Sequence, residues 1–257
     1  MFKVKLHLLT DERLKQLIQN EIKASNEKHA TDLQLEIIKK QISLSSLQSQ
    51  INPHFLYNAL ECVRGQAIID HAPVIVDMVQ AISNYFRYSI SSKSDIVTLN
   101  DEINNVKNYL KIQQFRFSNR FQVDFSYASE DILEAIIPKL TLQPIIENSI
   151  QHGFEKSLGE AKIKIEIIAT QKNINILISD NGLGMDKETL KRLNDKIVRY
   201  DVIKDNSSRH TGVAIPNIDK RLKMLFGEEY GIHIASLEGI GTDVEIHIPK
   251  LYELESS

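Results

Sequence analysis

The apolar positions divide the chain into a helical part that ends near residue 120 and a mixed part beyond it. Residues 11–52 contain no glycine or proline and predict one long helix. Its second half carries a heptad-like seam formed by Leu33, Ile37, Leu44, Leu47 and Ile51. Such a seam, interrupted only by Lys40, predicts a dimeric coiled coil. A single amphipathic helix packed on its own domain is the alternative, because residues 14–22 do not hold the register.

Pro53 and His54 stand within this helical pattern, where an interior proline costs roughly 3 kcal/mol. Beyond the proline, apolar residues cover about half of the helix at about 100° per residue: Ile51, Phe55, Leu56, Ala59, Leu60, Cys62 and Val63. The opposite, polar stripe consists of His54, Tyr57, Asn58, Glu61 and Gly65. Continuation of the upstream heptad would bury His54, so the proline marks a shift of register that presents this histidine to solvent.

The remaining chain alternates between helical and extended patterns. Helices are predicted over about 73–90, over 101–117 behind Asn100, from Pro144 to about Gly153, over 187–199, and from Asn217 to Phe226. Strands are predicted in QVDFSYA and in two hairpins, KIKIEIIAT with INILISD and IHIAS with DVEIHIP. Residues 200–211 have the composition of a loop. The fold class expected is therefore α followed by α/β.

Composition narrows the functional classes. A length of 257 residues allows one large or two ordinary domains, given roughly 150 residues per domain. The balance of 31 basic and 34 acidic residues gives no electrostatic argument for nucleic acid or for an anionic membrane. One cysteine, Cys62, cannot form an intramolecular disulfide, and no apolar run approaches the ~20 residues that cross a bilayer. We expect either a cytoplasmic protein or the intracellular part of a membrane-bound sensor.

The sequence DNGLG, from Asp180 to Gly184, directly follows the apolar strand ILIS. A carboxylate at a strand end is well placed to accept a hydrogen bond from an exocyclic amine. Gly182 and Gly184 would let the backbone approach a flat ligand closely. An ordinary strand-ending turn explains the same residues equally well.

Other candidate ligand-binding residues lie on helices and near a strand start. Glu147 and Asn148 share a helix with His152, one turn later, so that an amide oxygen for Mg²⁺ and an imidazole could face one phosphate group. Asparagine and histidine are also commonplace on helices, which is the stronger reading of these residues alone. The segment 211–217 precedes a helix whose N-terminus could bind phosphates, and Thr242 adds a hydroxyl.

Taken in order, five segments resemble the motif series of sensor histidine kinases of the YesM/LytS type. They are QINPHFLYNALE, LQPIIENSIQHGF, DNGLGMD, GVAIPNIDKRLKMLFGEEYG and GTDVEIHIP, and they cover about residues 45–250. The family joins a dimerising helical region, which carries a phosphoacceptor histidine, to a Bergerat-type α/β sandwich that binds ATP and is shared with gyrase and Hsp90. The resemblance implies a signalling helix over 1–52, phosphotransfer helices over 53–120, an ATP-binding domain over 121–250 and a tail over 251–257.

The resemblance also implies roles for individual residues. His54 would receive the γ-phosphoryl group of ATP, and Asn148 would bind Mg²⁺. Asp180 would hold the adenine amino group, with Gly182 and Gly184 beside it.

Further positions match the motifs at the edges of the site. Gly212 and Asn217 would belong to the phosphate-facing lid and Thr242 to the adenine side, while His152 stands where the family has a residue near the phosphates. The lid motif departs from the family pattern, because Ala214 occupies the position of its second glycine. A positive φ there would be costly for alanine.

Attack on a phosphate requires an exposed, neutral imidazole within reach of the ATP-bearing domain. Glu61 could orient the His54 ring or accept its proton, and Asn58 could position water in a reverse reaction. Glu147 completes the set of candidate catalytic residues. A solvated helix face accounts equally well for Asn58 and Glu61.

We therefore expect a homodimeric histidine autokinase that uses ATP and Mg²⁺ and passes the phosphoryl group to a response-regulator receiver domain. We expect no nucleic-acid partner, and contact with a membrane only through a sensor segment absent from this chain. One alternative is a degenerate, non-catalytic dimeric scaffold, supported by Ala214. Another is a gyrase/Hsp90-type ATPase, disfavoured because Pro144 stands where those enzymes usually carry a glutamate.

Overall fold

The computed structural model describes residues 53–90, 94–117, 121–154, 161–199 and 214–253. The helix predicted over 11–52, the loop predicted over 200–211 and Gly212 lie outside these residues. The chain divides into two units, Met1–Leu56 and Tyr57–Ser257. None of the described helices is both long and apolar enough to span a lipid bilayer.

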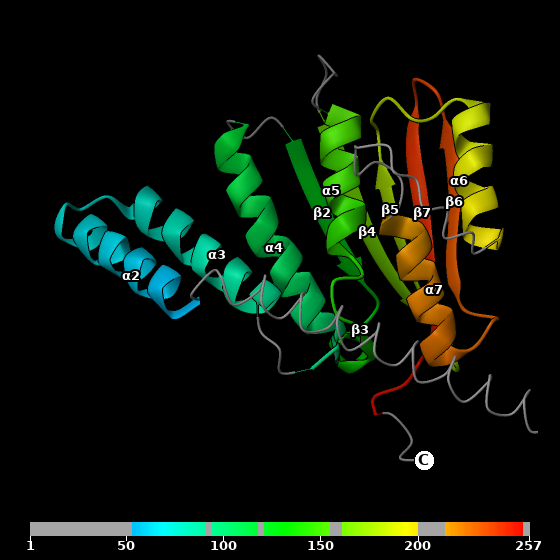
Figure 1. The fold of residues 1–257 in the computed structure, drawn as a ribbon, viewed down its shortest axis with the longest axis horizontal. Coiled ribbons are helices and arrows are strands. Elements are labelled where there is room, and N and C mark those ends of the chain that lie inside the picture. The colour runs from blue at the N-terminus through cyan, green and yellow to red at the C-terminus, as the bar shows by residue number, and fades with distance from the viewer. Residues whose placement is uncertain (1–52, 91–93, 118–120, 155–160, 200–213, 254–257) are drawn as a thin grey trace, which may run out of the picture. The chain divides into compact units, whose positions relative to one another are not determined.

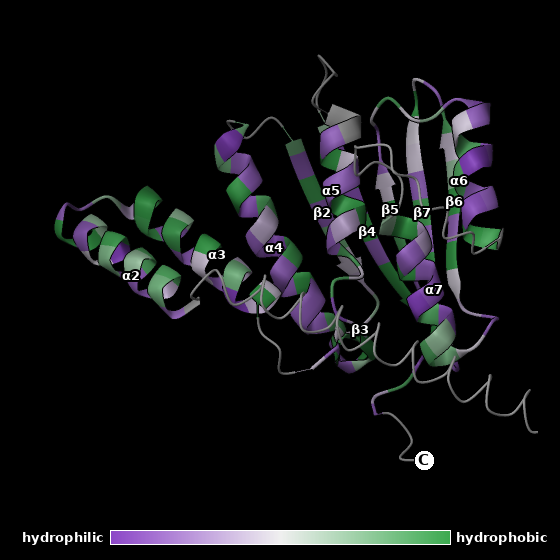
Figure 2. Cartoon of the chain, viewed as in Figure 1, coloured by the Kyte–Doolittle hydropathy of each residue, from purple (hydrophilic) through white to green (hydrophobic). Residues whose placement is uncertain are grey.

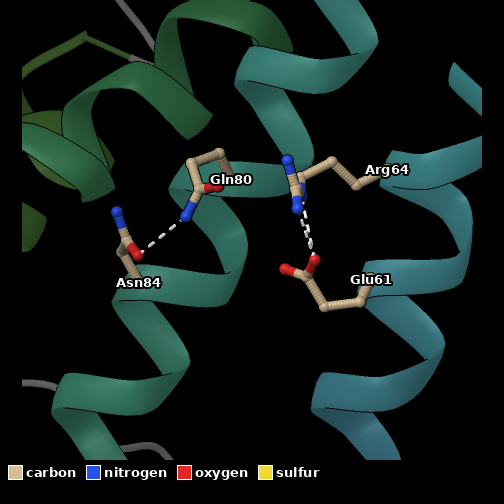
Figure 3. Close-up of polar contacts among 4 residues, drawn as sticks. All are labelled: Glu61, Arg64, Gln80 and Asn84. Carbon is tan, nitrogen blue, oxygen red and sulfur yellow. Dashed lines mark hydrogen bonds and ion pairs between the residues drawn. The ribbon is translucent and has the colours of Figure 1, made fainter. Parts of the chain in front are cut away.

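Two helices, α2 (Pro53–Ile69) and α3 (Pro73–Ile90), lie side by side and are joined by a short turn (Figures 1 and 3). The guanidinium of Arg87 on α3 lies over the ring of Tyr57 on α2, 5.7 Å from its centre. Hydrophobic residues recur along both helices in Figure 2. On α2 several of them are exposed, and Phe55 is 71% exposed.

Helix α4 (Leu99–Arg116) begins two residues before the predicted position because Thr98, not Asn100, caps it. The Thr98 hydroxyl accepts a hydrogen bond from the Asp101 amide at 3.1 Å, and the Asp101 carboxylate accepts one from the Thr98 amide at 3.2 Å. This reciprocal pair is a capping box, which satisfies two backbone donors that a helix start leaves open. The capping signal was therefore present in the sequence, two residues before Asn100.

Five strands form one mixed sheet in the order β2, β4, β5, β7, β6 (Figure 1). Their bounds are β2 Phe121–Tyr127, β4 Ala161–Ala169, β5 Asn173–Asp180, β7 Gly241–Pro249 and β6 Gly231–Leu237. The two predicted hairpins are confirmed, since β4 with β5 and β6 with β7 pair antiparallel. Strand β2 runs parallel to β4.

The inner face of the sheet is made almost entirely of isoleucine. Every second residue of the three central strands is buried there: Ile163, Ile165, Ile167, Ile174, Ile176, Ile178, Ile246 and Ile248. Full burial of such a side chain contributes roughly 1.5–3 kcal/mol. One stripe of α4 joins the same core through Leu99, Ile103, Val106 and Leu110, at the spacing of a single helix face. Helix α4 and the sheet therefore share one hydrophobic core.

Three further helices lie over this face of the sheet (Figure 1). They are α5 (Gln143–Asn148), α6 (Lys187–Arg199) and α7 (Ala214–Phe226). Helix α5 runs into one turn of π-helix, η2 (Ser149–Phe154). Helix α7 begins at Ala214, three residues before the predicted start at Asn217. The predicted class, a helical region followed by an α/β sandwich, is confirmed.

A small second sheet and a short helix were not predicted. Strands β1 (Ile96–Thr98) and β3 (Ile136–Pro138) pair antiparallel, and the 3₁₀-helix η1 (Glu130–Glu134) leads into β3. Strands of three residues are too short to show an alternating pattern. Their pairing connects segments far apart in the chain, which local periodicity does not reveal.

Candidate nucleotide-binding site

A cavity of about 530 Å³ lies between the sheet and the helices that cover it. Ligand pockets usually measure about 300–1,000 Å³. Its polar lining residues come from segments far apart in the chain: Asn148, Ser149, Asp180, Thr189, Arg192, Lys196 and Thr242. Its apolar wall includes Ile145, Met185, Leu193, Ile215, Ile234 and Val244. The cavity therefore offers a mostly apolar slot with a few polar groups, as a flat heterocycle with a charged tail requires.

Asp180, at the end of β5, provides a half-buried acceptor in this cavity. Burial raises the pKa of its carboxyl group, while hydrogen bonds from the Ser149 side chain and from the Gly182 and Thr242 amides act in the opposite direction. The Gly182 amide donates to Oδ1 at 3.0 Å. A carboxylate held in this way is oriented by the backbone and is well suited to accept a hydrogen bond from an amino group.

Gly184 and Gly241 allow the segments around Asp180 to approach each other. Gly184 has φ +62°, and a Cβ there would lie 2.0 Å from the Leu237 carbonyl oxygen. A Cβ on Gly241 would lie 1.9 Å from the Asp180 carbonyl oxygen. Gly182, the other glycine of the motif, is buried and contacts Asp180 through its amide, but it is not among the residues that line the cavity.

Ser236 joins these segments, and sequence reasoning missed it. Its hydroxyl lies 2.8 Å from the Gly241 carbonyl oxygen and 2.9 Å from the Thr242 hydroxyl, and it accepts a hydrogen bond from the Met185 amide at 2.9 Å. A serine inside a strand carries no distinctive signal. Only the pairing of β6 with β7 brings it beside the glycine-containing turn.

Glu147 and Asn148 are neighbours on α5, but they face different surroundings. Asn148 lines the cavity, and its side chain carries an amide oxygen. Glu147 is not part of the wall, and its carboxylate accepts a hydrogen bond from the Gln143 side chain at 2.7 Å. The structure therefore brings Asn148, but not Glu147, to the candidate site.

The remaining predicted site residues have different positions. His152 lies in η2, and its side chain is outside the described residues. Asn217 is exposed on α7 and does not line the cavity, whereas Ala214 and Ile215 do. A π-helical turn such as η2 is rare and frequently marks a functional site.

Ala214 does not have the strained backbone that was expected from its place at the second glycine of the lid motif. It is the first residue of α7, and only His71 and Leu140 have positive φ among the described non-glycine residues. The expected cost of alanine at a left-handed position therefore does not arise in this conformation. Helical backbone suits alanine better than glycine.

His54, Asn58 and Glu61, three members of the predicted polar stripe, are all exposed on α2. Glu61 forms an ion pair with Arg64, whose Nε and Nη2 donate to Oε2 at 2.9 and 2.7 Å (Figure 3). This hydrogen bond from Arg64 lowers the pKa of the Glu61 carboxyl group. On α3, the Gln80 side chain donates to Asn84 in a similar one-turn contact (Figure 3). Arg64 is thus a partner of Glu61 that we did not predict.

Two cations on the cavity rim also escaped prediction. Arg192 and Lys196 are one turn apart on α6 and line the same cavity as Asn148. Their spacing places them on one helix face, which is a sequence signal. That signal is weak, because α6 also carries Lys187 and Lys191. Their chemistry suits the phosphates of a nucleotide.

Glu102 anchors the turn that precedes α5. This glutamate is completely buried and accepts hydrogen bonds from the amides of Leu140, Thr141 and Leu142 at 2.6–2.8 Å, as well as from the Tyr88 hydroxyl. Leu140 has φ +57°, a conformation that costs a non-glycine residue roughly 1–2 kcal/mol. The carboxylate of Glu102 holds this turn in place.

Two family models match the chain. Residues 42–121 match the model described as Histidine kinase, and residues 135–251 match the model described as Histidine kinase-, DNA gyrase B-, and HSP90-like ATPase. The chain therefore joins a region of the histidine kinase family to a domain of the family shared with DNA gyrase B and Hsp90. The chain belongs to the sensor histidine kinases of the YesM and LytS type. The resemblance inferred from the five motifs is thereby confirmed.

Individual relatives give the extent of the similarity. The chain is 35% identical over 228 residues to the sensor histidine kinase YesM of Bacillus subtilis, which is 89% of this chain and 37% of YesM. It is 32% identical over 208 residues to the sensor protein LytS of Bacillus anthracis, 80% of this chain and 34% of LytS. The chain spans a little over a third of the length of these curated relatives.

A solved structure is also similar. The catalytic domain of histidine kinase ThkA is 18% identical, with a TM-score of 0.43, and the match covers 61% of this chain and 95% of that domain.

Proposed function

We propose that the chain is a histidine autokinase that transfers the γ-phosphoryl group of ATP to His54 and then to an aspartate of a response-regulator receiver domain. The observation that carries the proposal is the cavity itself. It gathers Asn148, Asp180, Gly184 and Thr242, four of the residues expected to bind ATP, from three separate parts of the sequence.

Different residues of the cavity would bind different parts of the nucleotide. Asp180 would accept a hydrogen bond from the adenine amino group, and Thr242 would lie on the same side. The Asn148 amide oxygen is a suitable ligand for Mg²⁺, whose other ligands would be phosphate oxygens and water. Arg192 and Lys196 would face the negative phosphates. Bound Mg²⁺ would spread the charge that develops on the transferred group.

His54 is the acceptor in this proposal because its helix presents it to solvent. One imidazole nitrogen would form a bond to the γ-phosphorus while the bond between that phosphorus and the β–γ bridging oxygen breaks. ADP leaves, and the ring loses its N–H proton to a base. Glu61 is a poorer candidate for that base than the sequence suggested, because the hydrogen bond from Arg64 lowers the pKa of its carboxyl group and so makes it a weaker base.

The exposed apolar surface of α2 supports a homodimer. Phe55, Val63 and Ile69 are 50–71% exposed in the single chain, and Ala59 and Cys62 are exposed on the same side. Burial of such a stripe against a second copy would form a bundle of helices. We assign residues 1–52 to signalling, 53–120 to dimerisation and phosphotransfer, 121–250 to ATP binding and 251–257 to a tail. We place the kinase in the cytoplasm, as the intracellular part of a sensor.

A degenerate scaffold without activity is the rival proposal, and its support is weaker than before. It rested on Ala214, whose backbone in α7 is helical and suits alanine.

Incubation with γ-labelled ATP tests the proposal. A phosphorylated histidine is a phosphoramidate, so the label should be lost in acid and retained in base. The proposal of an autokinase is overturned if the protein binds MgATP but acquires no label, or if the label that it acquires is stable in acid. Either result would favour a non-catalytic nucleotide-binding module.

A further inference from the structure

A buried polar junction lies where α3, α4 and α5 meet. Its centre is Gln143, the first residue of α5, which is only 7% exposed. The Gln143 Nε2 donates to the Tyr85 hydroxyl on α3 at 2.7 Å and to the Glu147 carboxylate at 2.7 Å. Its Oε1 accepts a hydrogen bond from Asn105 on α4 at 2.6 Å. One side-chain amide thus connects three helices.

All the hydrogens of this amide are used. A primary amide has two donor hydrogens and one acceptor oxygen, and Gln143 directs them to Tyr85, Glu147 and Asn105. A buried amide whose two donor hydrogens and acceptor oxygen are all paired fixes one arrangement, because a small displacement leaves one of these groups without its partner. The rotation of α5 about its own axis is therefore set by α3 and α4.

Tyr85 reaches Glu147 as well as Gln143. Burial raises the pKa of the Tyr85 hydroxyl, and the nearby negative charge of Glu147 acts in the same direction. The hydroxyl therefore stays protonated and available as a donor. The Tyr85 ring packs beside Phe86 and Tyr109, at centroid distances of 5.7 and 5.9 Å, which limits its movement.

Asn148 follows Glu147 directly in α5. The direction of the Asn148 side chain therefore depends on the same hydrogen bonds that fix the rotation of this helix. Helix α5 has six residues, and consecutive side chains differ by about 100° around its axis. Glu147 is held toward α3 while Asn148 lines the cavity. A rotation of α5 that released Glu147 would also turn the Asn148 amide away from its present place in the wall.

We propose that Tyr85 and Gln143 are positioning residues that hold Glu147 against α3 and thereby fix the direction of the metal-binding side chain of Asn148. The inference rests on the proposed binding of MgATP in the cavity. It assigns Glu147 a role in orientation instead of contact with the nucleotide. It also gives α3, which lies beside the helix that carries His54, a direct polar connection to the phosphate side of the site.

The test is Tyr85→Phe, which removes one hydroxyl and keeps the ring. Loss of one hydrogen bond in the chain should raise the Mg²⁺ concentration needed for half-maximal ATP binding by about three- to tenfold. Binding of adenosine, which has no phosphate and needs no metal, should stay within about twofold, because Asp180 and Thr242 are unaffected. Tyr127→Phe, on β2 outside this junction, is the matched control and should leave both values unchanged.

A double variant shows whether Tyr85 acts through Glu147. Glu147→Gln should shift the Mg²⁺ dependence in the same direction, and Tyr85→Phe together with Glu147→Gln should be no worse than Glu147→Gln alone. Strictly multiplicative effects would mean that the two residues act independently, which contradicts the inference. An unchanged Mg²⁺ dependence in Tyr85→Phe, or an equal loss of adenosine binding, would also overturn it.

The binding comparison does not depend on phosphoryl transfer. A wild-type protein that binds MgATP but does not label itself would refute the autokinase and would still show whether Tyr85 positions the metal site.

Discussion

Asp180 and Thr242 lie directly opposite each other on β5 and β7, and both line the cavity. Their pairing is a consequence of the strand register, which also sets Gly241 beside the Asp180 backbone. The Thr242 amide donates to the Asp180 carboxylate and orients it. The sheet itself therefore prepares the acceptor that we assign to the adenine amino group.

Asp180→Asn tests this assignment. A hydrogen bond to a charged group contributes about 1.5–3 kcal/mol, so the variant should bind both ATP and adenosine about ten- to a hundredfold more weakly. Titration of a fluorescent ATP analogue, with adenosine as competitor, measures the loss. Asp243→Asn, next to Thr242 but exposed, is the matched control and should bind normally. Equal losses in the two variants would remove Asp180 from the adenine side.

The pH dependence of the same titration gives a second readout for Asp180. Because burial raises the pKa of this carboxyl group, it takes up a proton at a higher pH than it would in the unfolded chain. In the absence of ligand, the ionised form of Asp180 therefore lowers the free energy of unfolding at a pH above the raised pKa. This destabilisation vanishes at a pH below the ordinary aspartate pKa of about 3.9. Nucleotide affinity needs the carboxylate and should fall as the pH drops through the raised pKa. Asp180→Asn should lack that step.

Gly184→Ala should destabilise the fold more than Gly239→Ala. Both glycines have positive φ, which costs an alanine roughly 1–2 kcal/mol, but only at Gly184 would the Cβ meet the Leu237 carbonyl group. Overpacking adds about 1–3 kcal/mol, giving a total of about 2–5 kcal/mol for Gly184→Ala. Urea unfolding of the two variants measures the difference. Indistinguishable midpoints would mean that the turn relaxes without cost.

Arg192→Ala and Lys196→Ala should weaken ATP binding by about two- to fivefold each, as expected for charge pairs formed by exposed side chains. Adenosine binding should not change, since it brings no phosphate to the rim. The loss should shrink at high salt, because screening weakens the interaction in the wild type as well. Lys191→Ala, exposed on the same helix and absent from the cavity wall, is the control. An equal effect on adenosine would contradict a phosphate role.

The central part of the fold and of the site was predictable because it follows local rules. The alternation of apolar and polar residues predicted the two hairpins. Asp180 at the end of its strand, with the glycines that follow, predicted one side of the cavity. Arg192 and Ser236 were missed because their roles depend on which segments meet across the sheet. Glu147 was assigned to catalysis from its place beside Asn148. Its actual partners, Gln143 and Tyr85, became visible only in the packing of α5 against α3.

The most direct test of the account compares His54→Gln with His71→Gln in the γ-labelled ATP experiment. His54 is exposed on α2, and His71 is an exposed histidine in the turn before α3. Both variants should bind ATP within about 0.5 kcal/mol of the wild type, as is usual for surface changes. We predict that His71→Gln labels normally and that His54→Gln acquires no base-stable label. Label retained in His54→Gln would contradict the assignment of His54 as the phosphoacceptor.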